Sequence, residues 1–180
     1  MKSLAGKFLL ATPMLVDPNF ARAVVLIIRH DDDGAFGFII NRPMPATVAD
    51  AIGPSVEAAA ECNDPVYFGG PCQGPVFAFH QHPLHGGEEP LSGVYVTTER
   101  HVIESLLTEN AQPMKILATY SGWGSEQLES EMAEGSWIVC EAKPDDIFDA
   151  DKDLWSRLHT RINLGRYVRP DQIPDDPSLN

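Results

Sequence analysis

The sequence predicts an α+β (mixed α/β) fold, a single compact domain with a largely β centre and three or four flanking helices. Three observations support this prediction. Short apolar runs rich in β-branched residues recur along the chain, amphipathic helical patterns separate some of them, and 180 residues suit one domain. Hydrophobic residues make up 43% and charged residues 22% of the chain, as in ordinary globular proteins.

Seven short apolar runs are predicted to be strands. They cover residues 24–28, 36–40, 66–68, 76–79, 94–96, 116–119 and 137–140. Because several of these runs are continuous rather than alternating, we expect strands that are covered on both faces. The acidic residues and the glycine of segment 29–34 predict a hairpin or a short loop between the first two strands.

Four helices are predicted, each from a capping residue followed by apolar residues at helical spacing. Asp50 stands three residues after the first cap, which is the spacing of a capping box. Gly135 is expected to end the third helix. The expected caps are, in chain order, Thr47, Thr98, Ser125 and either Asp149 or Asp151.

The two ends of the chain differ from the middle of the predicted domain, which spans residues 1–167. Segment 168–180 contains three prolines and three aspartates, and we expect a tail that is poorly ordered or lies on the surface. Near the other end, Pro13 cuts the apolar run 8–11 too short for a signal peptide. No stretch approaches the ~20 apolar residues of a membrane span, so no membrane association is expected.

Cysteine content and charge indicate the compartment and the partners. The three cysteines, Cys62, Cys72 and Cys140, are an odd number without C-x-x-C spacing, which fits reduced thiols in a cytoplasmic protein. The net charge is −13, from 26 acidic and 13 basic residues. Because lysines and arginines provide the attraction to phosphate groups, direct nucleic acid binding is disfavoured, as is attraction to anionic membranes.

Asn41 and Arg42 form the first part of a candidate ligand-binding site, at the end of a predicted strand. Pro43 cannot continue a strand ladder, and an asparagine side chain can bond to the backbone in a turn. The guanidinium of Arg42 can hold an anion or a carboxylate through two parallel hydrogen bonds. The alternative is an arginine that pairs with a nearby acidic side chain.

Gly69 and Gly70 form the second part, in a tight turn that follows a predicted strand and precedes Pro71. Two glycines permit a positive φ or the close approach of another segment of backbone. Exposed N–H groups in such a turn can form a nest that binds an anion. The alternative is a turn with a purely structural role.

Ser121, Gly122 and Trp123 form the third part, in an expected turn between a strand and a helix. Backbone N–H groups at the start of a helix bind anions. The segment is not a nucleophile elbow, because Thr119 and Trp123 occupy the positions where that pattern requires glycines. Trp123 also fits the role of an anchor over the core, since an indole buries a large area.

Three histidines, His80, His82 and His85, lie within six residues and carry side chains that bind zinc. Cys72 precedes them by eight residues, but no second cluster of typical ligands accompanies them. We therefore predict no metal and no cofactor, and interpret this segment as a surface loop. No residue is predicted to be catalytic, because a thiol enzyme needs a cysteine beside a histidine in an electropositive pocket.

Four groups of residues, taken together, resemble the YqgE/AlgH family. They lie in the family's order and at similar spacing, across about residues 5–162. They are 10–13 with 17–20, 34–43, 68–71 with 79–80, and 120–124 with 127–129 and 135–137. The resemblance implies a compact mixed α/β fold and no established reaction, and part of the family carries the label of a transcriptional regulator.

Three functions are therefore considered. The first is a non-enzymatic cytoplasmic binding or regulatory protein that recognises a protein partner or a small anionic ligand through the three candidate turns. The second is an enzyme of unknown reaction that uses Arg42 and the glycine-rich turns. The third is a transcriptional regulator, for which the net charge of −13 disfavours direct contact with DNA. The oligomeric state is left open.

Overall fold

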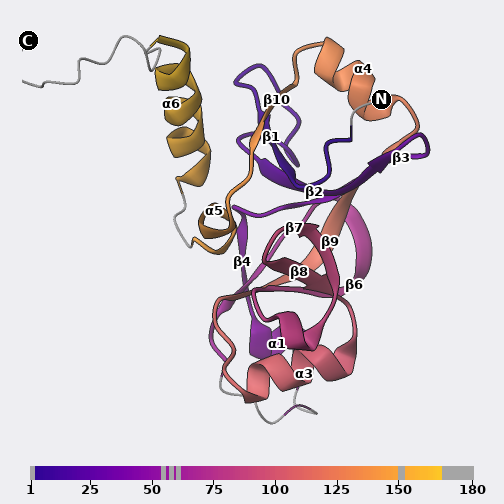
Figure 1. Cartoon of the computed structure of the whole chain (residues 1–180), viewed down its shortest axis with the longest axis vertical. Coiled ribbons are helices and arrows are strands. Elements are labelled where there is room, and N and C mark those ends of the chain that lie inside the picture. Colours follow the sequence, from indigo (N-terminus) through magenta and orange to yellow (C-terminus); the bar gives the residue numbers. More distant parts are fainter. Residues whose placement is uncertain (1–2, 54–55, 57–58, 60–61, 150–152, 168–180) are drawn as a thin grey trace, which may run out of the picture.

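Strand β9 (Met114–Gly124) joins the two halves of the sheet in the computed structural model of this protein (Figure 1). The structure describes residues 3–53, 56, 59, 62–149 and 153–167. Within these residues, ten strands form one curled, mainly antiparallel sheet, and five α-helices lie around it. The predicted α+β class is confirmed, with one α-helix more than the upper number expected.

The first half of the sheet begins at the end of β9. Strand β3 (Gly34–Ile39) runs antiparallel to β9, with Gly37 opposite Ser121 and Gly34 opposite Gly124. The strands that follow outward from β3 are also antiparallel to their neighbours. They are β2 (Val24–Asp31), β1 (Lys7–Ala11) and β10 (Trp137–Glu141).

The second half of the sheet lies along the earlier part of β9. Leu117 of β9 pairs with Phe77 of β6 on one side and, in parallel orientation, with Tyr67 of β5 on the other. A short strand, β4, pairs with β5, while β8 and β7 follow β6 outward. The bounds are β4 (Pro43–Thr47), β5 (Pro65–Tyr67), β6 (Cys72–His80), β7 (Glu88–Leu91) and β8 (Val94–Thr97).

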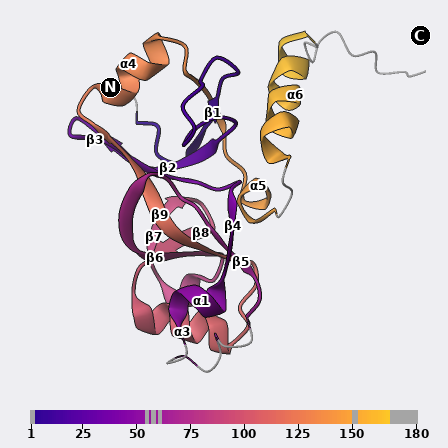
Figure 2. The same ribbon diagram turned by 180° about the vertical axis from the view of Figure 1, so that it is seen from behind.

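The helices cover different parts of the sheet (Figures 1 and 2). Helices α1 and α3 lie together beside the half that contains β6 and β8, whereas α4 packs near β3, β9 and β10. Helix α6 stands beside β1. Their bounds, with one 3-10 turn, are α1 (Val48–Ile52), η1 (Pro83–His85), α3 (Arg100–Thr108), α4 (Gln127–Ala133), α5 (Pro144–Phe148) and α6 (Leu154–Tyr167).

Strand β2 shows why the continuous apolar runs form the centre of the fold. Val24 and Leu26 point into one core, where the side chains of α6 also pack. Val25 and Ile27 point into a second core on the opposite face, which contains two tryptophans. All four side chains are fully buried, so the expectation that such strands are covered on both faces is confirmed.

Each of the seven predicted strands overlaps an observed strand. The first hairpin is tighter than expected, because β2 continues to Asp31 and leaves only Asp32 and Asp33 between the strands. Strands β1, β4 and β7 and helix α5 were not predicted. Strand β1 contains the apolar run 8–11 that resembles the core of a signal peptide, and its pairing with β2 and β10 makes it an interior strand of the sheet.

One predicted helix cap is confirmed. Thr47 and Asp50 form the capping box of α1, in which Thr47 Oγ1 accepts from the Asp50 N–H at 3.3 Å and the carboxylate of Asp50 accepts from the Thr47 N–H at 2.8 Å. The last predicted cap is wrong for Asp149, which instead ends α5. Asp151, the alternative, and the predicted tail 168–180 lie outside the described residues.

The two middle caps are also wrong. Helix α3 begins after Glu99 rather than Thr98, and α4 begins after Glu126, whose φ is 61°. Ser125 does not cap α4, because its hydroxyl donates to the carbonyl oxygen of Asp32 in the β2–β3 hairpin. The Ser125 hydroxyl is therefore engaged in a tertiary contact with the neighbouring hairpin. Gly135 lies two residues past the end of α4 with a φ of 82°, as expected for a glycine that stops a helix.

The predicted turn at Ser121–Trp123 is wrong as well, because these residues belong to β9. Ser121 and Trp123 are buried, whereas Gly122 and Gly124 are exposed, which is the alternation of a strand. The glycines suggested a turn, but they are the exposed positions of a strand that pairs with β3.

At Gly69 and Gly70, the segment between β5 and β6 lies so close to β9 that there is no room for a side chain. A Cβ atom added to Gly69 would lie 2.0 Å from the carbonyl oxygen of Thr119. One added to Gly70, where φ is +149°, would lie 2.1 Å from the Oγ of Ser121. Close backbone approach is therefore the reason for both glycines.

We predict that Gly69→Ala lowers the free energy of unfolding by about 1–3 kcal/mol or more, because its methyl group would overlap a backbone oxygen that cannot move freely. Gly122→Ala is the matched control on β9, since the nearest atom to its added Cβ, on the Tyr120 ring, would be 3.5 Å away. Urea denaturation measures both. Equal stability of the two variants would contradict the close approach.

Candidate functional site

The first predicted site residues, Asn41 and Arg42, hold neighbouring segments of backbone. The Asn41 side chain accepts from the Val24 N–H at 2.9 Å and donates to the Arg22 carbonyl at 3.0 Å. The guanidinium of Arg42 donates to the backbone oxygens of Asn19 at 2.5 Å and Ala21 at 2.9 Å. Burial lowers the pKa of Arg42, and the charge of Asp17 opposes this shift.

The second and third groups meet at one place on β9. The N–H groups of Gly69 and Gly70 both donate to the Thr119 hydroxyl, at 3.0 and 3.1 Å. The Ser121 hydroxyl donates to the Gly69 carbonyl at 2.9 Å, and this oxygen also accepts from the Ile39 N–H at 2.8 Å. The two N–H groups predicted to form an anion nest are thus directed at a side chain of the protein itself.

Trp123 is buried in the second core, where only 5% of it is exposed. This is the position expected for the anchor over the core that was one of its two predicted roles. Its indole N–H donates to Glu131 at 3.0 Å, and Trp137 donates to the same carboxylate oxygen at 2.8 Å. The structure therefore brings Gly69, Gly70 and Ser121 together but places Trp123 in the core. A ligand role for the seven selected residues stays a prediction, whereas their contacts stabilise the fold.

The three histidines are close to one another, but their ring nitrogens do not converge. The ring centroids of His80, His82 and His85 are all 6.3 Å apart. His80 Nδ1 accepts from the His82 N–H, while Nε2 of His82 and of His85 contact Gln112 and Glu109. In the described part of the chain, no group of three or more histidine, cysteine or acidic side chains is arranged to hold a metal ion.

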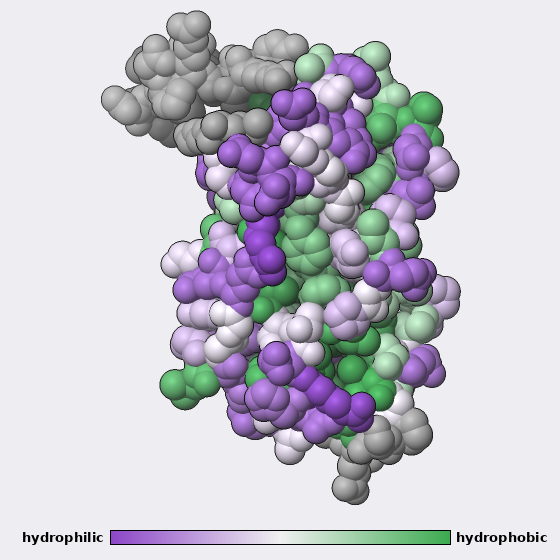
Figure 3. Space-filling model, turned by 90° about the vertical axis from the view of Figure 1, so that its right-hand side faces the viewer, coloured by the Kyte–Doolittle hydropathy of each residue, from purple (hydrophilic) through white to green (hydrophobic). Residues whose placement is uncertain are grey.

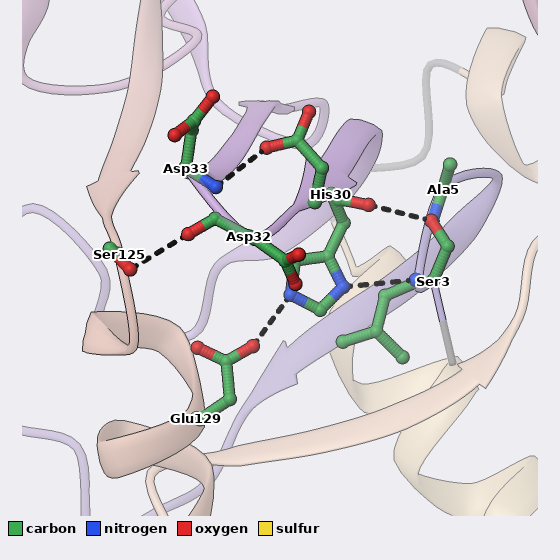
Figure 4. Close-up of polar contacts among 9 residues, drawn as sticks. Ser3, Ala5, His30, Asp32, Asp33, Ser125 and Glu129 are labelled. Atoms are coloured by element: carbon green, nitrogen blue, oxygen red, sulfur yellow. Dashed lines mark hydrogen bonds and ion pairs between the residues drawn. The ribbon is translucent and has the colours of Figure 1, made fainter. Parts of the chain in front are cut away.

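A buried histidine and a glutamate form a second polar cluster (Figure 4). His30 Nε2 lies 2.6 Å from the carboxylate of Glu129, and Nδ1 accepts from the Leu4 N–H at 3.1 Å. The hydroxyl of Ser3 donates to the backbone oxygen of His30 rather than to its ring. Both ring nitrogens are therefore occupied, and the cluster fastens the start of the chain to β2 and α4.

A cavity next to the start of β9 is lined by residues that the sequence analysis did not select. Its inner part has a volume of about 190 Å³ and is lined by Tyr67, Lys115 and Phe148, among others. An outer part of about 340 Å³ adjoins it and is lined by Cys62 and Asn110, among others. Asp64, Gln112 and Met114 line both parts. We call the two parts together the Lys115 groove.

Lys115 lines the inner part of this groove and is only 4% exposed. Its Nζ donates to the carbonyl oxygens of Ile40 at 3.0 Å and Asp149 at 3.4 Å, and lies 4.1 Å from the centroid of the Tyr67 ring. No carboxylate of the described residues is within ion-pair distance of this amine. Burial lowers the pKa of Lys115 to about 8, and the charge of Asp149 opposes the shift.

The phenol of Tyr67 and the thiol of Cys62, which also line the groove, keep their protons near neutral pH. Burial raises the pKa of the Tyr67 phenol, and the charges of Asp64 and Asp149 raise it further. Burial also raises the pKa of the Cys62 thiol. Tyr67 thus offers a hydroxyl donor, and Cys62 is not an activated nucleophile.

Lys115 was missed because the predicted strand began after it, at residue 116. Lysine is rarely buried, so its position beside an apolar run suggested a strand boundary. The signal was the alternation of the strand, because Lys115 and Leu117 lie two residues apart on the same face and both are buried.

We predict that the buried amine makes stability depend on pH. Its pKa is about 8 in the folded protein against an ordinary 10.5, so the unfolded chain binds more protons between these values and stability rises with pH there. Wild-type protein should gain roughly 3 kcal/mol relative to Lys115→Met between pH 8 and pH 10.5. Urea denaturation across this range measures the difference, and parallel stability curves would contradict it.

The comparisons with other proteins agree with the four motifs. The chain matches the AlgH-like family over residues 8–165. It is 36% identical to a UPF0301 protein of Streptomyces coelicolor, across 100% of this chain and 97% of that protein. A UPF0301 protein of Chlorobium phaeobacteroides is 37% identical across 99% of this chain and 97% of its own.

Two solved structures are similar in fold. The solution structure of the AlgH protein from Pseudomonas aeruginosa has a TM-score of 0.75 and 28% identity, and the match covers 92% of this chain and 93% of that one. A crystal structure from Corynebacterium diphtheriae has a TM-score of 0.69 at 22% identity, over 93% and 88% of the two chains, and supports the fold alone. Within the described residues, no helix is long and apolar enough to cross a bilayer. Because the family match spans most of its length, this chain belongs to the AlgH-like family.

Proposed function

We propose that this protein is a non-enzymatic cytoplasmic binding protein whose ligand is a small carboxylate held by Lys115 in the Lys115 groove. One observation carries the proposal. Lys115 lines a cavity, and its buried amine has backbone oxygens and an aromatic ring around it but no ion-paired carboxylate among the described residues. The charge of Asp149 acts on the amine without forming an ion pair with it. A buried charge without a counter-ion in contact is costly, and a bound carboxylate would supply that contact.

The surroundings of Lys115 favour a ligand with one negative charge over a phosphate. Among the described residues, the inner cavity is lined by one ammonium, the phenol of Tyr67 and the amide of Gln112, which is a small set of donors. Asp64 is exposed where the two parts of the groove meet, and the chain carries a net charge of −13. Both repel ligands of high negative charge. The amides of Asn110 and Gln112 offer hydrogen bonds to the other polar atoms of a small ligand.

The other two functions have less support. The basic residues of α6 are partly neutralised, since Arg157 pairs with Asp149 at 2.6 Å and Arg161 with Asp146 at 2.8 Å. The face in Figure 3 exposes both hydrophilic and apolar side chains, and the chain as a whole has 26 acidic against 13 basic residues. Direct DNA contact therefore stays disfavoured. The hypothesis of an enzyme that uses Arg42 has less support because the Arg42 guanidinium already donates hydrogen bonds to backbone oxygens.

We expect glycolate, a small carboxylate, to bind the wild-type protein and to shift the NMR signals of residues in the Lys115 groove. Lys115→Met should weaken binding about tenfold or more, because it removes a charge-assisted hydrogen bond. Lys143→Met is the control, since Lys143 is an exposed lysine that precedes α5 and does not line the groove. Titration monitored by NMR measures both affinities.

Two results would contradict the proposal. The first is glycolate binding that is equally strong in wild type and Lys115→Met. The second is the absence of any signal shift in the groove at millimolar glycolate, when wild-type protein is folded.

A further inference from the structure

Building on the proposed function, we propose that Lys115 binds its ligand covalently, as a reversible imine with a carbonyl group that lies next to the ligand's carboxylate. The ligand class is then a small 2-oxo acid, in either its aldehyde or its ketone form. The inner cavity, of about 190 Å³, accommodates a molecule of a few heavy atoms. The proposal requires a nucleophilic amine that faces the cavity, an environment that lowers its affinity for a proton, and no competing side-chain partner.

The contacts of Lys115 leave the nitrogen able to react. A neutral amine has two N–H bonds and one lone pair, whereas the ammonium form has three N–H bonds. The two N–H groups of the neutral amine can donate hydrogen bonds to the backbone oxygens of Ile40 and Asp149. The lone pair then has no hydrogen-bond donor among the described residues, which leaves it open to attack the carbonyl carbon of a ligand.

The neutral form of this amine is accessible at physiological pH. Burial lowers the pKa of Lys115 to about 8, so roughly one molecule in ten carries the neutral amine at pH 7. This fraction is roughly 300 times larger than for an amine whose pKa is the ordinary 10.5. Desolvated lysines in apolar surroundings form imines with carbonyl substrates for this reason.

The reaction balances without a cofactor. The lone pair of Nζ attacks the carbonyl carbon, a carbon–nitrogen bond forms, and the π bond of the carbonyl breaks to leave a carbinolamine. The two protons of the amine then leave with the carbonyl oxygen as water, and the remaining bond becomes C=N. Nothing is oxidised or reduced, and addition of water reverses the reaction.

The groove also suits the product. A protonated imine keeps the positive charge of Lys115, so its attraction to the Tyr67 ring and to the neighbouring carboxylate of the ligand is retained. Tyr67 brings a protonated phenol to the same wall of the cavity, where it can donate a hydrogen bond to the ligand. The low exposure of Lys115, 4%, limits the water that would hydrolyse the imine.

The test uses glyoxylate with cyanoborohydride, which reduces an imine to a stable amine. We expect one carboxymethyl group on Lys115 of the wild-type protein, located by peptide mass spectrometry. Labelling of Lys115 at pH 7 should be at least tenfold faster than labelling of the exposed Lys143 in the same molecule. The rate at Lys115 should rise with pH to a plateau above about 8. Lys115→Met should lose this label and keep the label on Lys143.

Labelling of Lys143 as fast as or faster than that of Lys115 would overturn the imine. So would a rate at Lys115 that still rises steeply above pH 10. Glycolate has no carbonyl and separates this inference from the proposed function. If glycolate binds at Lys115 but glyoxylate is not trapped there, the imine is wrong and the binding function stands. If glyoxylate is trapped but glycolate does not bind, the carboxylate site is wrong and the reactive amine stands.

Discussion

The fold depends on the approach of the Gly69–Gly70 backbone to strand β9. At this point Thr119 accepts from both glycine N–H groups, and Ser121 donates to the Gly69 carbonyl. The same carbonyl accepts from the Ile39 N–H at the end of β3. One oxygen therefore links β9, the glycine segment and β3, at the place where the partners of β9 change from β6 and β5 to β3. Only glycine allows this distance, because a Cβ would overlap backbone atoms.

This junction also positions the candidate site. The chain that leaves β3 after Ile39 carries the carbonyl of Ile40, which accepts from Lys115 Nζ. The segment that leads into the glycines carries Tyr67, whose ring lies beside the same amine. A buried lysine is unfavourable for stability, and the surrounding contacts only partly compensate for its desolvation. Unfavourable groups of this kind concentrate at functional sites, and the cavity beside Lys115 is why we propose a binding role for this one.

The fold class and most strands follow from local pattern, because a continuous run such as residues 24–28 has few other ways to bury its side chains. The helix caps were less predictable. Thr47 and Asp50 cap α1 through contacts within three residues, whereas Ser125 binds a hairpin distant in sequence. The candidate site was not predicted at all. Arg42 was selected as an arginine at the end of a predicted strand, and Ser121 as part of an expected turn before a helix. Lys115 instead gains its properties from strands and carbonyls that only the three-dimensional register brings together.

Lys115 is buried beside a cavity, and its amine donates to backbone oxygens. Burial keeps this amine from water and lowers its pKa, so that it is partly deprotonated near neutral pH. The direct measurement is an NMR titration of the Lys115 side chain in the folded protein, followed through the ¹³C signal of its Cε. The structure predicts a midpoint at a pH of about 8. A midpoint at or above the ordinary value of 10.5 would show that the amine is solvated, and it would contradict both the binding site and its chemistry.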